Sequence, residues 1–292
     1  MKAFKAHDSK VVKVKYSPDK TMFVTASEDG DIFFFQIGTD NLQKYEPLCM
    51  VQIPAEPKTR INDLRWDSNS SKILIGCANG RVYQYEKPKP SEINNHETYL
   101  VTDLPMREWR IKMMEFQMKK NQKKDPEEEE KKKRMRLRGE LPKEEDEPEE
   151  DWDPEPILSC IYLQDGTGRF IITSQGLFSG YFYVCDFNNL RPLSASPIPK
   201  HTLCKYLNYS ASGQLMLMGY DNGEVQIRHV DNPTKYLQIK MHDGQSGSIT
   251  AFHLDKSEKY ALTTAEDGLM YAYQIDAEII KKEALYDPLE GI

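Results

Sequence analysis

The residues whose types could do chemistry are histidines and cysteines. Two of the six histidines directly precede an aspartate, as His7-Asp8 and His242-Asp243. A histidine oriented by a carboxylate can act as a general base, but adjacent residues in a turn lack that geometry, and no activated nucleophile accompanies them. The sequence also contains no GxxxxGK[ST] loop, HExxH motif or EF-hand loop. We therefore expect no catalytic residue, no cofactor and no metal, and interpret His7 and His242 as structural.

The cysteines are widely separated and form no metal-binding spacing. They are Cys49, Cys77, Cys160, Cys185 and Cys204. Free cysteines that act as small buried hydrophobic residues are typical of a reducing intracellular compartment. The N-terminus has no apolar segment of a signal peptide, and no apolar run approaches the roughly 20 residues of a membrane span. The sequence thus predicts a cytoplasmic protein without a membrane partner.

A hairpin that recurs along the chain indicates which elements position these residues. The segment Thr25–Phe35 turns at Asp29-Gly30, and a similar segment near the C-terminus turns at Asp267-Gly268. Asp-Gly between apolar runs favours a hairpin, because glycine adopts a positive φ at no steric cost. Recurrence of such a hairpin predicts a repeat protein.

Five units share the order apolar strand, polar turn, apolar strand, glycine turn and aromatic strand. They cover residues 6–37, 57–87, 157–187, 201–230 and 246–276. The third unit is the most divergent, with Ser179-Gly180 where the others have Asp-Gly or Asn-Gly. A period of about 40–45 residues with several short strands per unit is typical of a β-propeller. An unrelated β-sandwich is the alternative.

The first unit resembles the WD-repeat family. His7, the segment Val14–Asp19 and the segment Ser27–Gly30 are similar to that family's Gly-His start, Phe-Ser-Pro-Asp turn and Ser-x-Asp-Gly turn. The resemblance implies a buried tetrad of Asp, His, Ser/Thr and Trp in each blade. No Trp-Asp pair ends the third strand of a unit, however. The family's Trp position is occupied by Phe35, Tyr85, Cys185, Arg228 and Tyr273.

Because Phe35 cannot donate a hydrogen bond, we expect an incomplete tetrad in the first unit and more reliance on aromatic packing. The resemblance implies a set of structural repeat positions along the chain. They are His7, Ser27, Asp29, Gly30, Phe35, Asn79, Gly80, Tyr85, Asn222, Gly223, His242, Asp267, Gly268 and Tyr273.

Residues 88–156 interrupt the repeats. Thr98–Leu104 could supply one outer strand, and Pro105 can open a helix, since its missing N–H is not needed in the first turn. Four apolar residues then follow at helical spacing: Met106, Trp109, Met113 and Phe116. This stripe could pack on the rim of its own propeller, or it could be an exposed anchor for another protein.

The second half of the interruption segregates its charges. Residues 119–138 hold ten basic and five acidic side chains, whereas residues 140–155 hold ten acidic and one basic. Such blocks predict disorder or a solvated helix. The basic block could attract nucleic acid or acidic tubulin tails, but the missing aromatic residues, the acidic neighbour and the net charge of −7 argue against nucleic acid. Trp152 is expected to mark the point where the chain docks again.

The whole chain resembles the C-terminal part of the second propeller in cilia- and flagella-associated WD-repeat proteins. The resemblance rests on Glu28–Phe35, the charged insertion before Asp151-Trp152, Ser196–Pro199 and His242–Gly247. It implies a non-catalytic scaffold in the ciliary axoneme, a cytoskeletal location, that tethers inner-arm dynein motor heads to the doublet microtubule. The implied partners are other axonemal proteins, including an inner-arm dynein heavy chain and tubulin. A WD-repeat adaptor in another intracellular assembly is the alternative.

The predicted organisation is all-β, a WD40-like propeller with about five recognisable blades and a charged, partly helical insertion. Residues 1–87 hold two repeats, 88–156 the insertion, 157–276 three repeats and 277–292 a tail. We expect the five units to belong to a seven-bladed ring, within the general range of about 4–8 blades. Met1–Lys5 could instead close a five-bladed ring as an outer strand; otherwise a chain that completes the propeller is a further expected partner.

Overall fold

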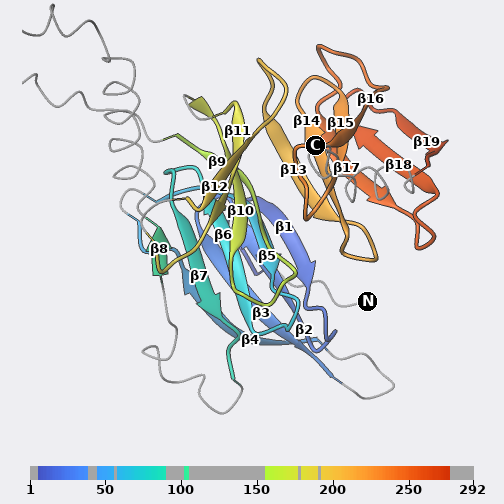
Figure 1. Cartoon of the computed structure of the whole chain (residues 1–292). Coiled ribbons are helices and arrows are strands. Elements are labelled where there is room, and N and C mark those ends of the chain that lie inside the picture. Colours follow the sequence, from blue (N-terminus) through green and yellow to red (C-terminus); the bar gives the residue numbers. More distant parts are fainter. Residues whose placement is uncertain are drawn as a thin grey trace, which may run out of the picture. The chain divides into compact units, whose positions relative to one another are not determined.

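The computed structural model describes residues 6–38, 45–55, 58–89, 155–176, 179–189 and 192–276, and the backbone of 102–104 (Figure 1). These residues belong to one compact unit, formed by residues 1–104 and 155–292. The second unit, residues 105–154, lies outside the described residues. The described residues form five antiparallel sheets.

Each of the first two sheets has four strands in simple up-and-down order. The first sheet contains β1 (Val11–Tyr16), β2 (Met22–Ser27), β3 (Asp31–Ile37) and β4 (Tyr45–Gln52). The second sheet contains β5 (Ile61–Trp66), β6 (Lys72–Cys77), β7 (Val82–Glu86) and β8 (Thr102–Leu104). The strand β8 pairs with Val82–Gln84, so the end of the predicted segment Thr98–Leu104 does supply an outer strand.

The remaining three sheets repeat the same order. The third contains β9 (Ile157–Tyr162), β10 (Phe170–Ser174), β11 (Tyr181–Cys185) and β12 (Ser194–Pro197). The fourth contains β13 (Cys204–Tyr209), β14 (Leu215–Tyr220), β15 (Glu224–His229) and β16 (Tyr236–Lys240). The fifth contains β17 (Ile249–Leu254), β18 (Tyr260–Ala265) and β19 (Met270–Gln274), and has three strands among the described residues.

The glycine turns predicted from sequence form in four units. Gly30, Gly80, Gly223 and Gly268 have φ values of 89°, 76°, 79° and 76°. The third unit differs, since the positive-φ glycine between β10 and β11 is Gly176, with φ of 87°, rather than the expected Gly180. The turn between β10 and β11 is therefore longer than in the other units.

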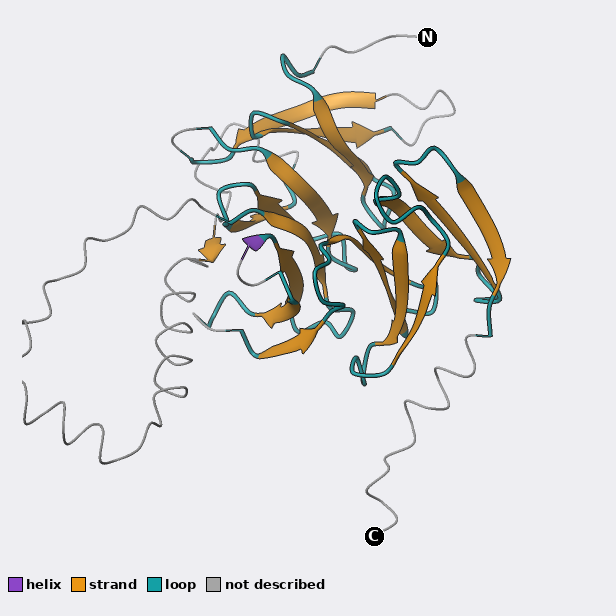
Figure 2. Ribbon diagram, turned by 90° about the horizontal axis from the view of Figure 1, so that it is seen from above, coloured by secondary structure: helices purple, strands orange, loops and turns teal. Residues whose placement is uncertain are grey.

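Neighbouring sheets pack through their first strands. β1 contacts β5, β5 contacts β9, β9 contacts β13, and β13 contacts β17, so the sheets follow one another in chain order. Figure 2 shows the sheets from above. Two second strands carry a glycine where the next sheet approaches. A Cβ on Gly76 would lie 2.7 Å from the Ile157 Cγ2, and one on Gly219 would lie 2.5 Å from the Ile249 Cγ2. Only a residue without a side chain allows this close approach.

The outer strands β4, β12 and β16 are additions to the sequence prediction, which found three strands per unit. Each of them pairs with the aromatic strand before it. Their side chains are mostly exposed or half-buried. Strands of this kind lack the buried apolar pattern from which a strand is predicted in a sequence.

Candidate functional site

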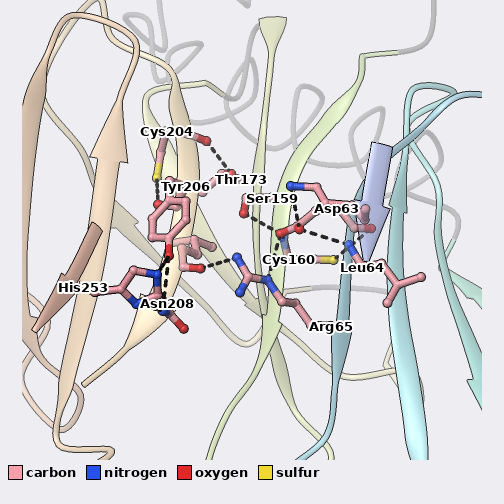
Figure 3. A network of polar contacts seen from close by, with 12 residues as sticks. Asp63, Leu64, Arg65, Ser159, Cys160, Thr173, Cys204, Tyr206, Asn208 and His253 are labelled. Atoms are coloured by element: carbon pink, nitrogen blue, oxygen red, sulfur yellow. Dashed lines mark hydrogen bonds and ion pairs between the residues drawn. The ribbon is translucent and has the colours of Figure 1, made fainter. Parts of the chain in front are cut away.

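A network of polar and ionic contacts joins the inner strands of all five described sheets (Figure 3). Its centre is Asp63 on β5, whose side chain is 1% exposed. The Asp63 carboxylate pairs with Arg65 Nε at 3.3 Å and with Lys13 Nζ of β1 at 3.3 Å. On the side of the third sheet it accepts a hydrogen bond from Ser159 Oγ at 2.7 Å and from the Cys160 N–H at 3.2 Å.

The charges of this network stabilise one another. Burial alone would raise the pKa of Asp63, but Arg65, Lys13 and the bonds from β9 lower that pKa to about 2. Burial would likewise lower the pKa of Arg65, but Asp63 raises it above its ordinary value. A buried ion pair persists only where such charges and hydrogen bonds satisfy one another.

Arg65 extends the network to the fourth sheet. Its Nη2 donates to the Leu207 carbonyl at 2.6 Å, and its guanidinium lies 5.7 Å from the centre of the Tyr206 ring. Tyr206 Oη and Asn208 Nδ2 in turn contact the two ring nitrogens of His253 on β17, each at 3.2 Å. Burial, with Lys15 and Arg65, lowers the pKa of His253, so the neutral ring can accept from Asn208 and donate to Tyr206.

A hollow of about 300 Å³ opens at the ends of β1, β5, β9 and β13. Its lining includes Lys15, Arg65, Trp66, Tyr162 and Tyr209. Burial, with the nearby charge of Arg65, lowers the pKa of Lys15 to about 8 against the opposing effect of Asp63. The basic side chains Lys15 and Arg65 would favour an anionic group, while Asp67 also lines the hollow.

The first and fifth sheets each hold a histidine bonded to a threonine. His7 Nε2 lies 2.7 Å from Thr25 Oγ1, and His242 Nε2 lies 3.0 Å from Thr263 Oγ1. In the fifth sheet the other ring nitrogen of His242 lies 2.9 Å from the Asp267 carboxylate. The fifth sheet thus contains three members of the tetrad that the WD-repeat resemblance implies.

The arrangement Asp267, His242 and Thr263 looks like a catalytic triad, but its burial favours a structural role. Thr263 is 1% exposed and His242 is 4% exposed, so a substrate has no access to the hydroxyl. An aromatic edge also covers the imidazole, since the Tyr271 ring centre lies 4.8 Å away. In the first sheet, Asp29 accepts from Ser27 Oγ instead of reaching His7.

The residues at the family's Trp position pack or bond in different ways. Phe35 is 3% exposed and stacks on Phe23 with ring centres 4.6 Å apart. Tyr85 is buried and donates to the Gln52 carbonyl of the first sheet at 3.4 Å. Burial raises the pKa of the Tyr273 hydroxyl to about 12, and the nearby Thr263 side chain partly offsets this rise. Cys185 is buried too, and burial raises its pKa to about 12.

Arg228, which the sequence analysis placed at the family's Trp position, has a structural role that the sequence did not predict. It is 1% exposed, and its guanidinium donates to the carbonyls of Pro197 at 2.9 Å and Pro233 at 2.7 Å. It also donates to Gln226 Oε1 and lies 4.6 Å from the Tyr236 ring centre. Arg228 therefore ties the fourth sheet to the outer strand of the third.

The asparagines of the Asn-Gly turns cap their own hairpins. Asn79 Oδ1 accepts from the Arg81 N–H at 3.1 Å, and Asn222 Oδ1 accepts from the Glu224 N–H at 3.2 Å. Asn79 also receives support from the segment before β5, since its N–H donates to Thr59 Oγ1 at 3.1 Å. These contacts stabilise turns and leave the asparagines no evident chemical role.

Two sheet faces have no neighbouring sheet among the described residues. The first free face lies on the first sheet, opposite the second sheet, and consists of Val14, Tyr16, Phe23, Phe33, Phe35, Tyr45 and Met50. The last free face lies on the fifth sheet, opposite the fourth sheet, and consists of Tyr260, Leu262, Thr264 and Met270. No described strand of the first sheet packs extensively on the fifth.

Some predicted contacts lie outside the described residues. They are the candidate partner contacts Met106, Trp109, Met113, Phe116 and Trp152, together with Met1–Lys5. Among the residues that are described, no group of three or more His, Cys, Asp or Glu side chains could hold a metal ion. In the same part of the chain, no helix has the length and apolar character needed to cross a membrane.

Comparison with known proteins agrees with this geometry. The WD40 family profile (WD domain, G-beta repeat) matches residues 1–36, the segment that contains His7, Thr25 and the first glycine turn. The chain resembles WD-repeat proteins, and its fold is a WD40-like β-propeller. The propeller is similar to the β-propeller domain of Cps50 (Swd1) from Myceliophteria thermophila, with a TM-score of 0.58 and 13% identity over 98% of this chain and 70% of that chain.

One similar protein is associated, by its name, with cilia and flagella. The propeller chain is 23% identical over 330 residues to cilia- and flagella-associated protein 44 of Mus musculus. The similarity covers 95% of this chain and 17% of the mouse protein, so the chain spans about a sixth of that relative's length. The predicted resemblance to cilia- and flagella-associated WD-repeat proteins is thereby confirmed.

Proposed function

We propose that this chain is a non-catalytic structural scaffold of the ciliary or flagellar axoneme. The observation that carries the proposal is its similarity, over 95% of its length, to a cilia- and flagella-associated protein. The site geometry supports a scaffold, because the histidine–threonine pairs are buried and the inner-strand network joins sheets. Propellers commonly act by presenting surfaces to several proteins rather than by catalysis.

The finer part of the proposal concerns the partners. We propose that the scaffold helps to hold inner-arm dynein motor heads near the doublet microtubule, with a dynein heavy chain and tubulin among its neighbours. The structural repeat positions would maintain the blades, and Met106, Trp109, Met113, Phe116 and Trp152 would contact partners. A further chain that completes the propeller is part of the same proposal.

Localisation tests the proposed function directly. The full chain would carry a fluorescent tag in ciliated cells, and axonemes would be extracted with detergent before imaging and immunoblotting. We expect the tagged chain to remain with the extracted axonemes, as a doublet-bound scaffold must. Release of the chain with the detergent-soluble fraction would refute the ciliary role and favour an adaptor in another intracellular assembly.

Proximity labelling tests the finer part. A biotin ligase fused to the chain should label an inner-arm dynein heavy chain more strongly than an outer-arm one, because labelling falls off with distance. Equal labelling of both classes would contradict the tethering role while leaving an axonemal scaffold intact. A fusion to a protein of the ciliary membrane provides the control for nonspecific labelling.

A further inference from the structure

The hollow at the ends of β1, β5, β9 and β13 contains cationic groups that the inner-strand network does not use. Lys15 lines it near the end of β1, and its Nζ forms no hydrogen bond or ion pair among the described residues. Arg65 lines it from β5, with Nε bonded to Asp63 and Nη2 to the Leu207 carbonyl. Its Nη1 has no hydrogen-bond partner in the described part of the chain. Lys15 and Arg65 therefore retain donors for a ligand.

Both cations belong to well-anchored parts of their strands. The Lys15 carbonyl accepts a hydrogen bond from Trp66 Nε1 at 3.3 Å, so the end of β1 is tied to β5. Arg65 lies between the Asp63 carboxylate and the Tyr206 ring (Figure 3). A ligand would thus meet a lysine with an anchored backbone and an arginine with a fixed guanidinium, which lowers the entropic cost of binding.

The ionised groups in and next to the hollow leave one positive charge unbalanced. They are three cations and two carboxylates: Lys13, Lys15, Arg65, Asp63 and Asp67. The Asp67 carboxylate is engaged in its own turn, where it accepts hydrogen bonds from the N–H groups of Ser71 and Lys72. Burial, with the two nearby cations, lowers the pKa of His253, so its ring is neutral at pH 7 and adds no charge.

We propose that the hollow binds one carboxylate side chain from an acidic peptide segment of a partner protein, with Lys15 and Arg65 as the donors. A single negative charge balances the lining, whereas a phosphate dianion would exceed it. Phosphate sites are commonly built on glycine-rich loops or helix N-termini, and neither is present among the described residues that line the hollow. Its volume of about 300 Å³ is at the lower end for ligand sites and suits a side chain better than a nucleotide.

Two features of the free chain are costly, and a bound carboxylate would relieve them. Burial, Arg65 and Lys13 lower the pKa of Lys15 to about 8, and Asp63 opposes them. A carboxylate within hydrogen-bond distance would favour the charged amine and raise that pKa. Tyr209 also lines the hollow, and its buried hydroxyl has no hydrogen-bond partner among the described residues. An unsatisfied buried hydroxyl costs free energy, which a polar ligand in the hollow would reduce.

Binding of a labelled acidic peptide to the purified full chain tests this inference. The probe is a fluorescein-labelled hexaglutamate peptide, followed by fluorescence anisotropy at low salt, and a hexaglutamine peptide is the neutral control. The variant Lys15→Met removes the charge that has no partner. The matched control is Lys205→Met, because Lys205 also belongs to an inner strand but is exposed and does not line the hollow.

We expect the wild type and Lys205→Met to bind hexaglutamate with similar affinity, and Lys15→Met to bind it at least about tenfold more weakly, because a charge-assisted hydrogen bond is lost. Residues 119–138 could also attract the peptide through their basic side chains, so equal affinity of all three proteins would overturn the inference. No binding by the wild type would overturn it too, even if the chain's own acidic residues fill the hollow. Displacement of the peptide by an equal concentration of inorganic phosphate would contradict the carboxylate assignment.

Acetylation of lysines provides a measurement that needs no variant. Limiting acetic anhydride modifies deprotonated amines, so Lys15, with a pKa of about 8, should react readily near neutral pH. Saturating hexaglutamate should slow acetylation of Lys15 at least about tenfold, because a rise of one pKa unit reduces the deprotonated fraction about tenfold. Acetylation of Lys205, followed by mass spectrometry of peptides in the same samples, should not change. Unchanged acetylation of Lys15 at saturation would overturn the inference.

The carboxylate site and the proposed function can fail separately, because both measurements use the purified chain. If the chain stays in extracted axonemes but Lys15 is neither needed for binding nor protected, the scaffold role survives and the carboxylate site does not. If the chain is absent from axonemes but hexaglutamate protects Lys15, the carboxylate site survives without the ciliary role.

Discussion

Replacing Asp63 with alanine tests whether the inner-strand network holds the sheets together. The variant removes one carboxylate and leaves Arg65, whose side chain is 11% exposed, without its charge partner. Breaking a buried ion pair from one side costs about 3–5 kcal/mol, because a buried charge remains uncompensated. Domains are stable by only about 5–15 kcal/mol, so the variant should lose a large part of its stability.

The same reasoning predicts how the wild-type chain responds to acid. The folded pKa of Asp63 is about 2, below the value of about 4 for an unfolded aspartate. The unfolded state therefore binds a proton first as the pH falls, and the contribution of Asp63 is lost progressively between about pH 5 and 1. Full stability from this group is present above about pH 5, and the Asp63→Asn variant should lack this part of the acid dependence.

Urea unfolding followed by circular dichroism provides the measurement, with the midpoint and slope compared between variants. Asp165→Ala is the control, because its pair with Arg169 is exposed and should be worth less than about 1 kcal/mol. The double variant Asp63→Leu, Arg65→Met should recover much of the loss, since it removes both buried charges. A loss below about 1 kcal/mol in Asp63→Ala, or a double variant less stable than the single one, would refute the reasoning.

Three further predictions concern packing and charge. Gly219→Ala should lower the free energy of unfolding, measured in thermal melts, by about 1–3 kcal/mol, because its Cβ would lie 2.5 Å from the Ile249 Cγ2. The control is Gly166→Ala, whose Cβ would have no neighbour within 4 Å, so that this variant tests only the cost of a positive φ. Arg228→Lys should cost about 2 kcal/mol or more in urea, since one ammonium cannot reproduce the guanidinium bonds to the Pro197 and Pro233 carbonyls. The pKa of Lys15 is about 8 in the folded chain and about 10 in the unfolded chain, so the free energy of unfolding of the wild type should rise between about pH 8 and 10. Lys15→Met should stabilise the chain at pH 7 and remove this rise. A Lys15→Met variant with an unchanged pH profile would contradict that assignment.

The sequence was sufficient to predict the repeat and its turns, because these depend on local chemistry. Asp29-Gly30 and Asp267-Gly268 require a positive φ that few residues adopt, and both hairpins form as expected. The outer strand β16 was missed because its side chains alternate between exposed and half-buried positions without a strong apolar run. Outer strands are held by pairing to a neighbour, and pairing leaves little trace in one sequence.

The inner-strand network was also beyond the reach of sequence reasoning. In the sequence alone, Asp63 and Arg65 have the pattern of ordinary polar residues on the exposed face of a strand. Their burial depends on Ser159 and Leu207, which are separated from them by 96 and 142 residues in the chain. Residue types alone do not show which charges meet at such distances, so only the assembled sheets reveal the pairing.

The divergent repeats show how a blade can persist without the family's tryptophan. The bond from His7 to Thr25 spans 18 residues and the bond from His242 to Thr263 spans 21, so each connects the segment before the sheet to its second strand. An aromatic edge lies against each imidazole, from Phe33 at 4.7 Å and from Tyr271 at 4.8 Å. The aromatic contact is thus made two positions before the expected tryptophan. In the first and fifth units, a His and a Thr 18 and 21 residues apart, before a glycine turn, therefore mark the blade where no Trp-Asp pair is present.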